Sequence, residues 1–131
     1  MTRILLDTSA YSAFLRGHDS IKGVLQGADE VCLSATILGE LLAGFRRGAH
    51  QRKNQAELER FLSSPRVQVL DVDRETAERY AVILDGLRRS GTPIPTNDIW
   101  IAATAMQHGL RLVTTDAHYR HVGQVVVDYF E

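Results

Sequence analysis

The chain has one cysteine, three prolines and no long uninterrupted apolar run among its 131 residues. The single Cys32 excludes an internal disulfide scaffold, and its apolar segment VCLS predicts a buried thiol. The apolar runs are far shorter than the roughly 18 residues that a membrane helix needs. The amino-terminal segment also reaches an acid too early for a signal peptide. We therefore expect a cytoplasmic protein with no membrane segment.

An excess of positive charge is also missing. The 15 Lys and Arg against 16 Asp and Glu give a net charge of −1, which argues against a simple basic nucleic-acid binder. With 44% hydrophobic residues, a chain of this length buries enough surface to fold without a metal or a disulfide. We found no repeat, linker or low-complexity tract, so a single domain over residues 1–131 is expected.

Short apolar runs alternate with longer segments of helical periodicity, which is typical of a parallel sheet with helical crossovers. Four or five strands are predicted, at residues 3–6, 31–34, 67–70, 111–114 and, least clearly, 124–128. Helical segments are predicted at 36–47, 52–63, 73–90 and 96–109. A break near Gly48 makes the first two a hairpin, Gly91 and Gly109 end the others, and Thr96 or Asn97 is expected to cap the last.

Three acids lie where strands or connectors end. Asp7 follows the first strand, Asp116 follows the strand RLVT after one further Thr, and Asp98 lies in the first turn of the last long helix. The carboxyl ends of parallel strands share one edge, where such folds place their chemistry. Each acid by itself is more simply explained as a cap or turn residue.

Glu40 strengthens the case for a shared site. Its helical neighbours are Gly39, Ala43 and Gly44 rather than other charges, so a substrate or another element can approach it closely. Four carboxylates together repel one another unless a cation lies among them, and all-oxygen ligands suit Mg²⁺ or Mn²⁺. Such ions also bind phosphate oxygens, which indicates phosphodiester or phosphoryl-transfer chemistry. Outside the four acids the surface carries a small positive excess that tolerates an RNA backbone.

Four blocks in this order resemble the PIN-domain ribonucleases of the VapC toxin type: LLDTSAYSAFL, SATILGELLAGF, IPTNDIWIAATAMQHG and GLRLVTTDAHYRHVGQVVV. The resemblance implies a three-layer α/β/α sandwich around a parallel sheet. It also implies that Asp7, Glu40, Asp98 and Asp116 form the metal centre. Thr8, Ser9 and Thr114 would be polar supports that orient the carboxylates or water.

The family activity is metal-dependent endoribonuclease cleavage, with a Mg²⁺ or Mn²⁺ ion activating the attacking water and leaving a 5′-phosphate and a 3′-hydroxyl. The resemblance further implies a cognate VapB-type antitoxin, an RNA substrate and a homodimer or larger toxin–antitoxin assembly. The apolar faces of 36–47 and 52–63 are the expected docking groove for the antitoxin. A basic side chain of the antitoxin, most simply an arginine, would reach from there to the four acids.

Thr115 and Tyr119 depart from the Arg or Asn and the Phe often found in the last block, and we expect neither to touch the acids. His118 and His121 are the only histidines with helical ligand spacing, but without a thiolate partner they do not predict a zinc site. Trp100 is interpreted as a core or dimer-packing residue. The basic residues near the hairpin bend are either a solvated face or phosphate contacts; they are Arg46, Arg47, Arg52 and Lys53.

Other functions fit less well. A receiver domain needs an acidic pair after its first strand and a lysine after its last, and a haloacid-dehalogenase-like phosphatase needs an acid where Ser9 stands. Walker A and dinucleotide-binding glycine motifs are also missing. The remaining alternative is a catalytically silent PIN-like module that binds RNA or a protein partner, and the presence of all four acids argues against it.

Overall fold

All 131 residues, Met1–Glu131, are described by a computed structural model. Five parallel strands form one sheet in the order β3-β2-β1-β4-β5. The strands are β1 (Arg3–Leu6), β2 (Glu30–Ser34), β3 (Val67–Leu70), β4 (Arg111–Thr114) and β5 (Val127–Tyr129). The sheet of four or five parallel strands is therefore confirmed.

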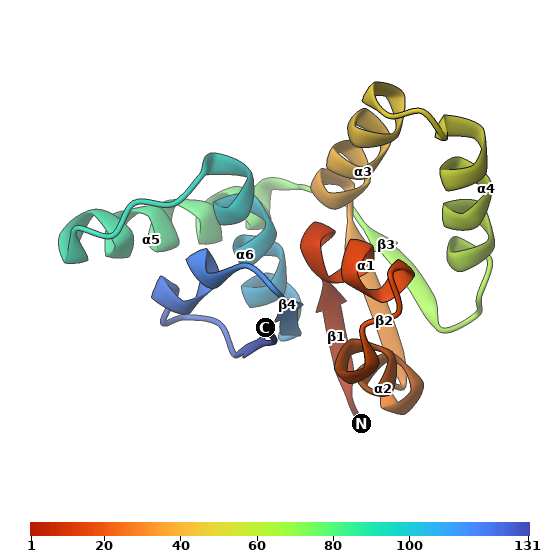
Figure 1. Cartoon of the computed structure of the whole chain (residues 1–131). Helices are drawn as coiled ribbons and strands as arrows, with labels where there is room; N and C mark the ends of the chain where they lie inside the picture. The colour runs from red at the N-terminus through yellow and green to blue at the C-terminus, as the bar shows by residue number, and fades with distance from the viewer.

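Six α-helices and one short 3-10 helix connect the strands. They are α1 (Thr8–Leu15), α2 (Asp19–Gly27), α3 (Ala35–Arg47), α4 (Gln51–Leu62), α5 (Arg74–Ser90), α6 (Thr96–His108) and η1 (Ala117–His121). Because parallel crossovers are right-handed, this strand order puts α1 to α4 on one face of the sheet and α5, α6 and η1 on the other. Figure 1 shows α5 and α6 on the opposite side of the molecule from α4. The predicted three-layer α/β/α fold class is confirmed.

The core lies on the central strands, because β1, β2 and β4 are covered on both faces and are rich in aliphatic residues. Leu5, Cys32 and Leu112 have no exposed surface, so the predicted burial of the cysteine is confirmed. Burial raises the pKa of the Cys32 thiol to about 12, which keeps it protonated and unreactive. None of the helices is long and apolar enough to cross a membrane.

Several element boundaries differ from the sequence prediction. The last strand begins at Val127 rather than at 124, because the chain meets β4 only where the carbonyl of Val126 accepts from the Leu112 amide at 2.9 Å. The predicted cap at Thr96 or Asn97 is wrong, since α6 follows Pro95 and has no side-chain cap. The carbonyl of Pro95 accepts from the Ile99 amide instead. The helices α5 and α6 end as predicted at Gly91 and Gly109, each of which has a left-handed backbone conformation.

The sheet has its topological switch point between β1 and β4. From β1 the chain runs outward to β2 and β3, and it then crosses back to β4 and continues to β5. Open α/β sheets bind ligands in the crevice outside the carboxyl ends of the strands at such a point. Asp7, which follows β1, and Asp116, which follows β4, therefore lie on the two sides of the switch point.

Candidate metal centre

Asp7 is the most enclosed of the four predicted acids, with an exposed fraction of 2%. It is also the N-cap of α1, because Oδ1 accepts from the Ala10 amide at 2.8 Å. Thr114 donates its hydroxyl to Oδ2 at 2.7 Å, and the Ser9 hydroxyl lies 2.9 and 3.1 Å from the two carboxylate oxygens. Asp7 thus combines the cap role with a place at the switch point.

Burial raises the pKa of Asp7 to about 6, although the hydrogen bonds from Thr114, Ala10 and Ser9 oppose this rise. The negative charge of Asp116 raises the pKa of Asp7 a little further, because the two carboxylates are close enough to repel each other. No basic side chain neutralises Asp7. A buried carboxylate of this kind favours a proton or a metal cation beside it.

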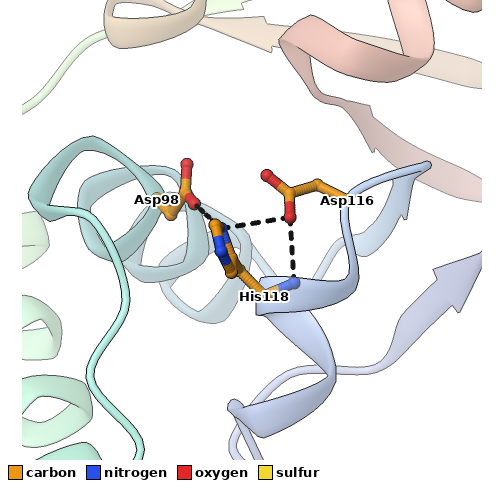
Figure 2. A group of neighbouring side chains, drawn as sticks. All are labelled: Asp98, Asp116 and His118. Atoms are coloured by element: carbon orange, nitrogen blue, oxygen red, sulfur yellow. Dashed lines mark hydrogen bonds and ion pairs between the residues drawn. The ribbon is translucent and has the colours of Figure 1, made fainter.

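Asp98 and Asp116 form the second side of the site (Figure 2). Asp98 is the third residue of α6 and is 9% exposed, whereas Asp116 is partly exposed and caps η1. Burial and the charge of Asp116 raise the pKa of Asp98, while bonds to His118 and Tyr119 lower it. Oxygens of the two carboxylates lie within 4.8 Å of each other and of a His118 ring nitrogen.

Glu40 lies in the second turn of α3, directly beyond β2. Its Oε1 accepts from the Thr8 hydroxyl at 2.6 Å and its Oε2 from the Asn97 side-chain amide at 3.4 Å. These bonds tie α3 to the starts of α1 and α6. Glu40 also borders a cavity of about 570 Å³ with Thr8, Thr36, Gly39, Ala43, Arg47 and Asn97. The open surface predicted around Glu40 is therefore present.

The three predicted polar supports all make hydrogen bonds within the site. Thr8 bonds to Glu40, and Ser9 and Thr114 bond to Asp7. Thr114 also accepts from the Asp116 amide at 2.9 Å, and Ser9 from the Thr115 amide at 3.1 Å. The loop after β4 is thereby fixed against the loop after β1, which sets the relative positions of Asp7 and Asp116.

Two side chains take positions that the sequence analysis did not foresee. Tyr119, expected not to touch the acids, donates its buried hydroxyl to Asp98 Oδ1 at 3.2 Å, because η1 turns it under the site. Burial, with the charges of Asp7, Asp98 and Glu40, raises the pKa of Tyr119 far above its ordinary value. His118 lies against Asp98 and Asp116.

Trp100 stacks on Tyr80 of α5 with ring centroids 4.2 Å apart, so it packs two helices together. This agrees with the packing interpretation rather than with a role in base stacking. Tyr80 lies within the predicted helix at 73–90. The buried residues of α5 are Thr76, Ile83 and Leu87, whereas Ala77 and Ala81 are exposed.

The donor set fits a small divalent cation. Asp7, Glu40, Asp98 and Asp116 offer carboxylate oxygens from four separate elements at the carboxyl ends of the strands, and no lysine or arginine pairs with any of them. Oxygen ligands of this number and charge are those that Mg²⁺ and Mn²⁺ take in proteins. Burial, and to a lesser extent the charge of Asp116, raises the pKa of Asp7 and of Asp98, and a bound cation would offset both effects.

Comparison with known proteins identifies the family of this chain. The PIN domain family matches residues 4–125. Ribonuclease VapC4 of Mycobacterium tuberculosis is 32% identical over 128 residues, which cover 95% of each chain. The tRNA(fMet)-specific endonuclease VapC of Salmonella typhimurium is 36% identical over 86 residues, covering 66% of this chain and 64% of that protein.

A solved structure shows the same fold. The crystal structure of DNA-bound VapBC from Salmonella typhimurium contains a chain with a TM-score of 0.85 and 27% identity, and the match covers 98% of both chains. The family match covers most of the chain, and VapC4 is similar along nearly the whole length of both proteins. This chain therefore belongs to the PIN-domain family, among the VapC ribonucleases.

Proposed function

We propose that this chain is a metal-dependent endoribonuclease and the toxin of a VapBC-type toxin–antitoxin pair. The proposal is supported by carboxylate oxygens of Asp98 and Asp116 that lie within 4.8 Å of each other, in a chain of the VapC family. Hydrogen bonds from Thr114 to Asp7 and from Thr8 to Glu40 link the other two acids to the same edge of the sheet. Mg²⁺ or Mn²⁺ held there would activate water and neutralise charge on a scissile phosphate.

The protein's own contribution is to hold the carboxylates in place. Thr114 and Ser9 fix the orientation of Asp7, Thr8 fixes Glu40, and Tyr119 fixes Asp98. Because these groups are ordered before a ligand arrives, little reorganisation is needed when a phosphate binds.

The cavity beside Glu40 is a suitable path for the RNA backbone. Its walls contain the small residues Gly39 and Ala43, and Arg47 is the only cationic side chain that lines it. Arg47 lies two helical turns from Glu40 on α3, about 10 Å along the axis. Of the four basic residues near the hairpin bend, Arg47 is therefore the one that we expect to bind a phosphate.

Cleavage of RNA by the purified chain tests this function. Total RNA and purified transfer RNA are incubated with EDTA, Mg²⁺ or Mn²⁺, and the ends of the products are analysed. Transfer RNA is the first defined substrate because one relative is a tRNA(fMet)-specific endonuclease. We expect cleavage only with metal, leaving a 5′-phosphate and a 3′-hydroxyl. Binding of RNA without cleavage under any condition would instead favour the catalytically silent module.

The proposed inhibitor of this nuclease is a VapB-type antitoxin, since a chain of the VapBC structure has the same fold. On α3, Leu42 is 38% exposed, whereas Phe45 is partly buried against the core, so Leu42 is the more accessible of these two apolar residues to a partner. A second apolar surface lies beside α4 rather than between α3 and α4. It is a cavity of about 310 Å³ whose lining includes Phe14, Leu25 and Phe61.

Co-purification with the product of the neighbouring gene tests this partner. We expect inhibition of cleavage that weakens when Leu42 is replaced by Asp, or when the partner's basic residues are replaced by Ala. Inhibition that survives both changes would contradict an inhibitor that docks on α3 and reaches the acids with a basic side chain. Light scattering of the free chain and of the complex tests the predicted homodimer or larger assembly.

A further inference from the structure

The imidazole of His118 lies between two of the predicted metal-binding acids, Asp98 and Asp116. Its Nδ1 atom lies 3.2 Å from Asp98 Oδ2 and 3.1 Å from Asp116 Oδ1 (Figure 2). The sequence analysis noted the spacing of His118 and His121 but predicted no metal site from it, and the structure brings His118 together with two of the predicted metal-binding acids.

The backbone of η1 holds the imidazole at this place. Asp116 Oδ1 accepts from the His118 amide at 2.9 Å, and the side chain of Asp116 is the cap from which η1 starts. Tyr119, the next residue, is buried and bonds to Asp98. The residue at position 118 is thereby fixed between Asp98 and Asp116 by contacts on both sides.

The spacing of the three side chains matches that of metal ligands. Two ligands at about 2.1 Å from an octahedral ion, at right angles to each other, are about 3 Å apart. The separations of Nδ1 from the two carboxylate oxygens have this size, and all three ligand atoms lie within 4.8 Å of one another. A lone pair on Nδ1 that faces two carboxylate oxygens needs a proton or a metal ion between them.

We propose that His118 is a nitrogen ligand of the metal held by Asp98 and Asp116, and that it makes the site prefer Mn²⁺ to Mg²⁺. This inference rests on the proposed metal-dependent function. Imidazole nitrogen binds first-row transition ions well, whereas Mg²⁺ prefers a set made only of oxygen atoms. A mixed set of one nitrogen and several carboxylates therefore discriminates between two ions that four carboxylates alone would bind in a similar way.

The competing explanation is that His118 only positions the acids, by donating a hydrogen bond from Nδ1 to Asp98 or Asp116. Both explanations predict that loss of the imidazole weakens cleavage, so activity does not separate them. They differ in whether a histidine nitrogen is bonded directly to the ion.

Pulsed electron paramagnetic resonance of the Mn²⁺-loaded full chain makes this distinction. We expect a ¹⁴N coupling to Mn²⁺ in the wild type, its replacement by a ¹⁵N coupling after labelling with ¹⁵N-histidine, and its loss in His118→Gln. His121→Gln is the matched control, because this exposed residue ends the same 3-10 helix and makes no contact with the acids. It should keep the coupling.

Calorimetric titration gives a second readout. His118→Gln should weaken Mn²⁺ binding by about 10-fold or more and change Mg²⁺ binding by much less, with circular dichroism melts showing that the variant is folded. Wild-type protein that binds Mn²⁺ without a histidine coupling would overturn the proposal and leave the metal centre standing. Wild-type protein that binds neither ion would overturn the metal-dependent function itself, and the ligand proposal with it.

Discussion

The two sides of the candidate metal centre are built differently. On the β1 side, Asp7 is buried and receives hydrogen bonds from the Ala10 amide and from the hydroxyls of Thr114 and Ser9. On the β4 side, Asp116 is partly exposed and Asp98 bonds to two side chains of η1. One carboxylate is therefore enclosed by fixed neutral donors, and the others face a short, exposed helix.

This difference indicates a division of labour. The enclosed side sets where the ion lies, since Asp7 has little freedom to move and its charge is poorly solvated. The open side is where solvent and a phosphate can enter, beside Asp116 and the exposed His118. This division predicts that substitutions around Asp7 reduce cleavage and metal affinity more than substitutions of the residues that support Asp98 and Asp116.

The largest effect is expected from Asp7→Asn, which keeps the shape of the side chain and removes its charge. Cleavage of RNA should fall by more than about 100-fold, because this change removes a direct ligand, and the loss of a supporting residue already costs 10 to 100-fold. Asp98→Asn should also lose cleavage. Initial rates at saturating Mn²⁺ measure both losses. Metal-dependent cleavage retained by either variant, when freshly purified, would remove that residue from the centre.

The same Asp7→Asn variant should be more stable than the wild type when metal is absent. The pKa of Asp7 is raised to about 6, above its value in the unfolded chain, so its contribution to stability is present below about pH 4 and is lost as the pH rises to 6. At pH 7.5 in EDTA the variant should gain up to about 3 kcal/mol, and at pH 4 the gain should vanish.

Melts of both proteins in EDTA across this pH range measure the difference. Mn²⁺ at 1,000 times its dissociation constant should reverse the order, because an ion that binds only the folded state then stabilises the wild type by about 4.1 kcal/mol. A gain of Asp7→Asn that does not depend on pH would show that the carboxylate is not strained by burial.

Thr114→Val tests the rigidity of the enclosed side. The change keeps the volume of a side chain that is not exposed but removes the hydroxyl that donates to Asp7 and accepts from the Asp116 amide. Affinity for Mn²⁺ should fall by about 10 to 100-fold. Calorimetric titration measures it, and Thr104→Val is a control, since Thr104 is equally buried but bonds only to the carbonyl of Trp100. Equal affinities of the two variants would mean that Thr114 does not order the site.

The sequence was sufficient for the parts of the fold and site that depend on local pattern. Runs such as RILL and RLVT are rich in aliphatic residues because both faces of the strand are covered, and this pattern identified β1 and β4. The position of Asp7 and Asp116 after those strands followed directly, because parallel strands end at one edge. Glycine at 91 and 109 marked two helix ends for an equally local reason, the left-handed backbone that each adopts.

Features that depend on long-range contacts were not predicted. The short helices α1 and α2 went unassigned, because their buried residues are few and the helices are stabilised by the sheet that they cover. The prediction for Tyr119 was wrong and the contact of His118 was not predicted, because a 3-10 helix turns neighbouring residues to different sides and both contacts with Asp98 span about twenty residues of sequence. The sequence did contain one signal for His118. It lies two residues after Asp116, and an acid that caps a turn brings the residues just after it close to its own carboxylate.

The smallest effect is expected on the open side, from Tyr119→Phe. The variant keeps the buried ring and loses only the hydroxyl that bonds to Asp98 Oδ1 at 3.2 Å. Asp98 keeps its contact with His118, and the lost bond is long, so stability should fall by about 1 kcal/mol. Affinity for Mn²⁺ should fall by less than about 10-fold, below the loss expected for Thr114→Val. Thermal melts and metal titrations of the two variants, measured side by side, test this order. If Tyr119→Phe costs as much metal affinity as Thr114→Val, the two sides are equally rigid, and the ion is positioned by the whole ring of acids rather than by Asp7.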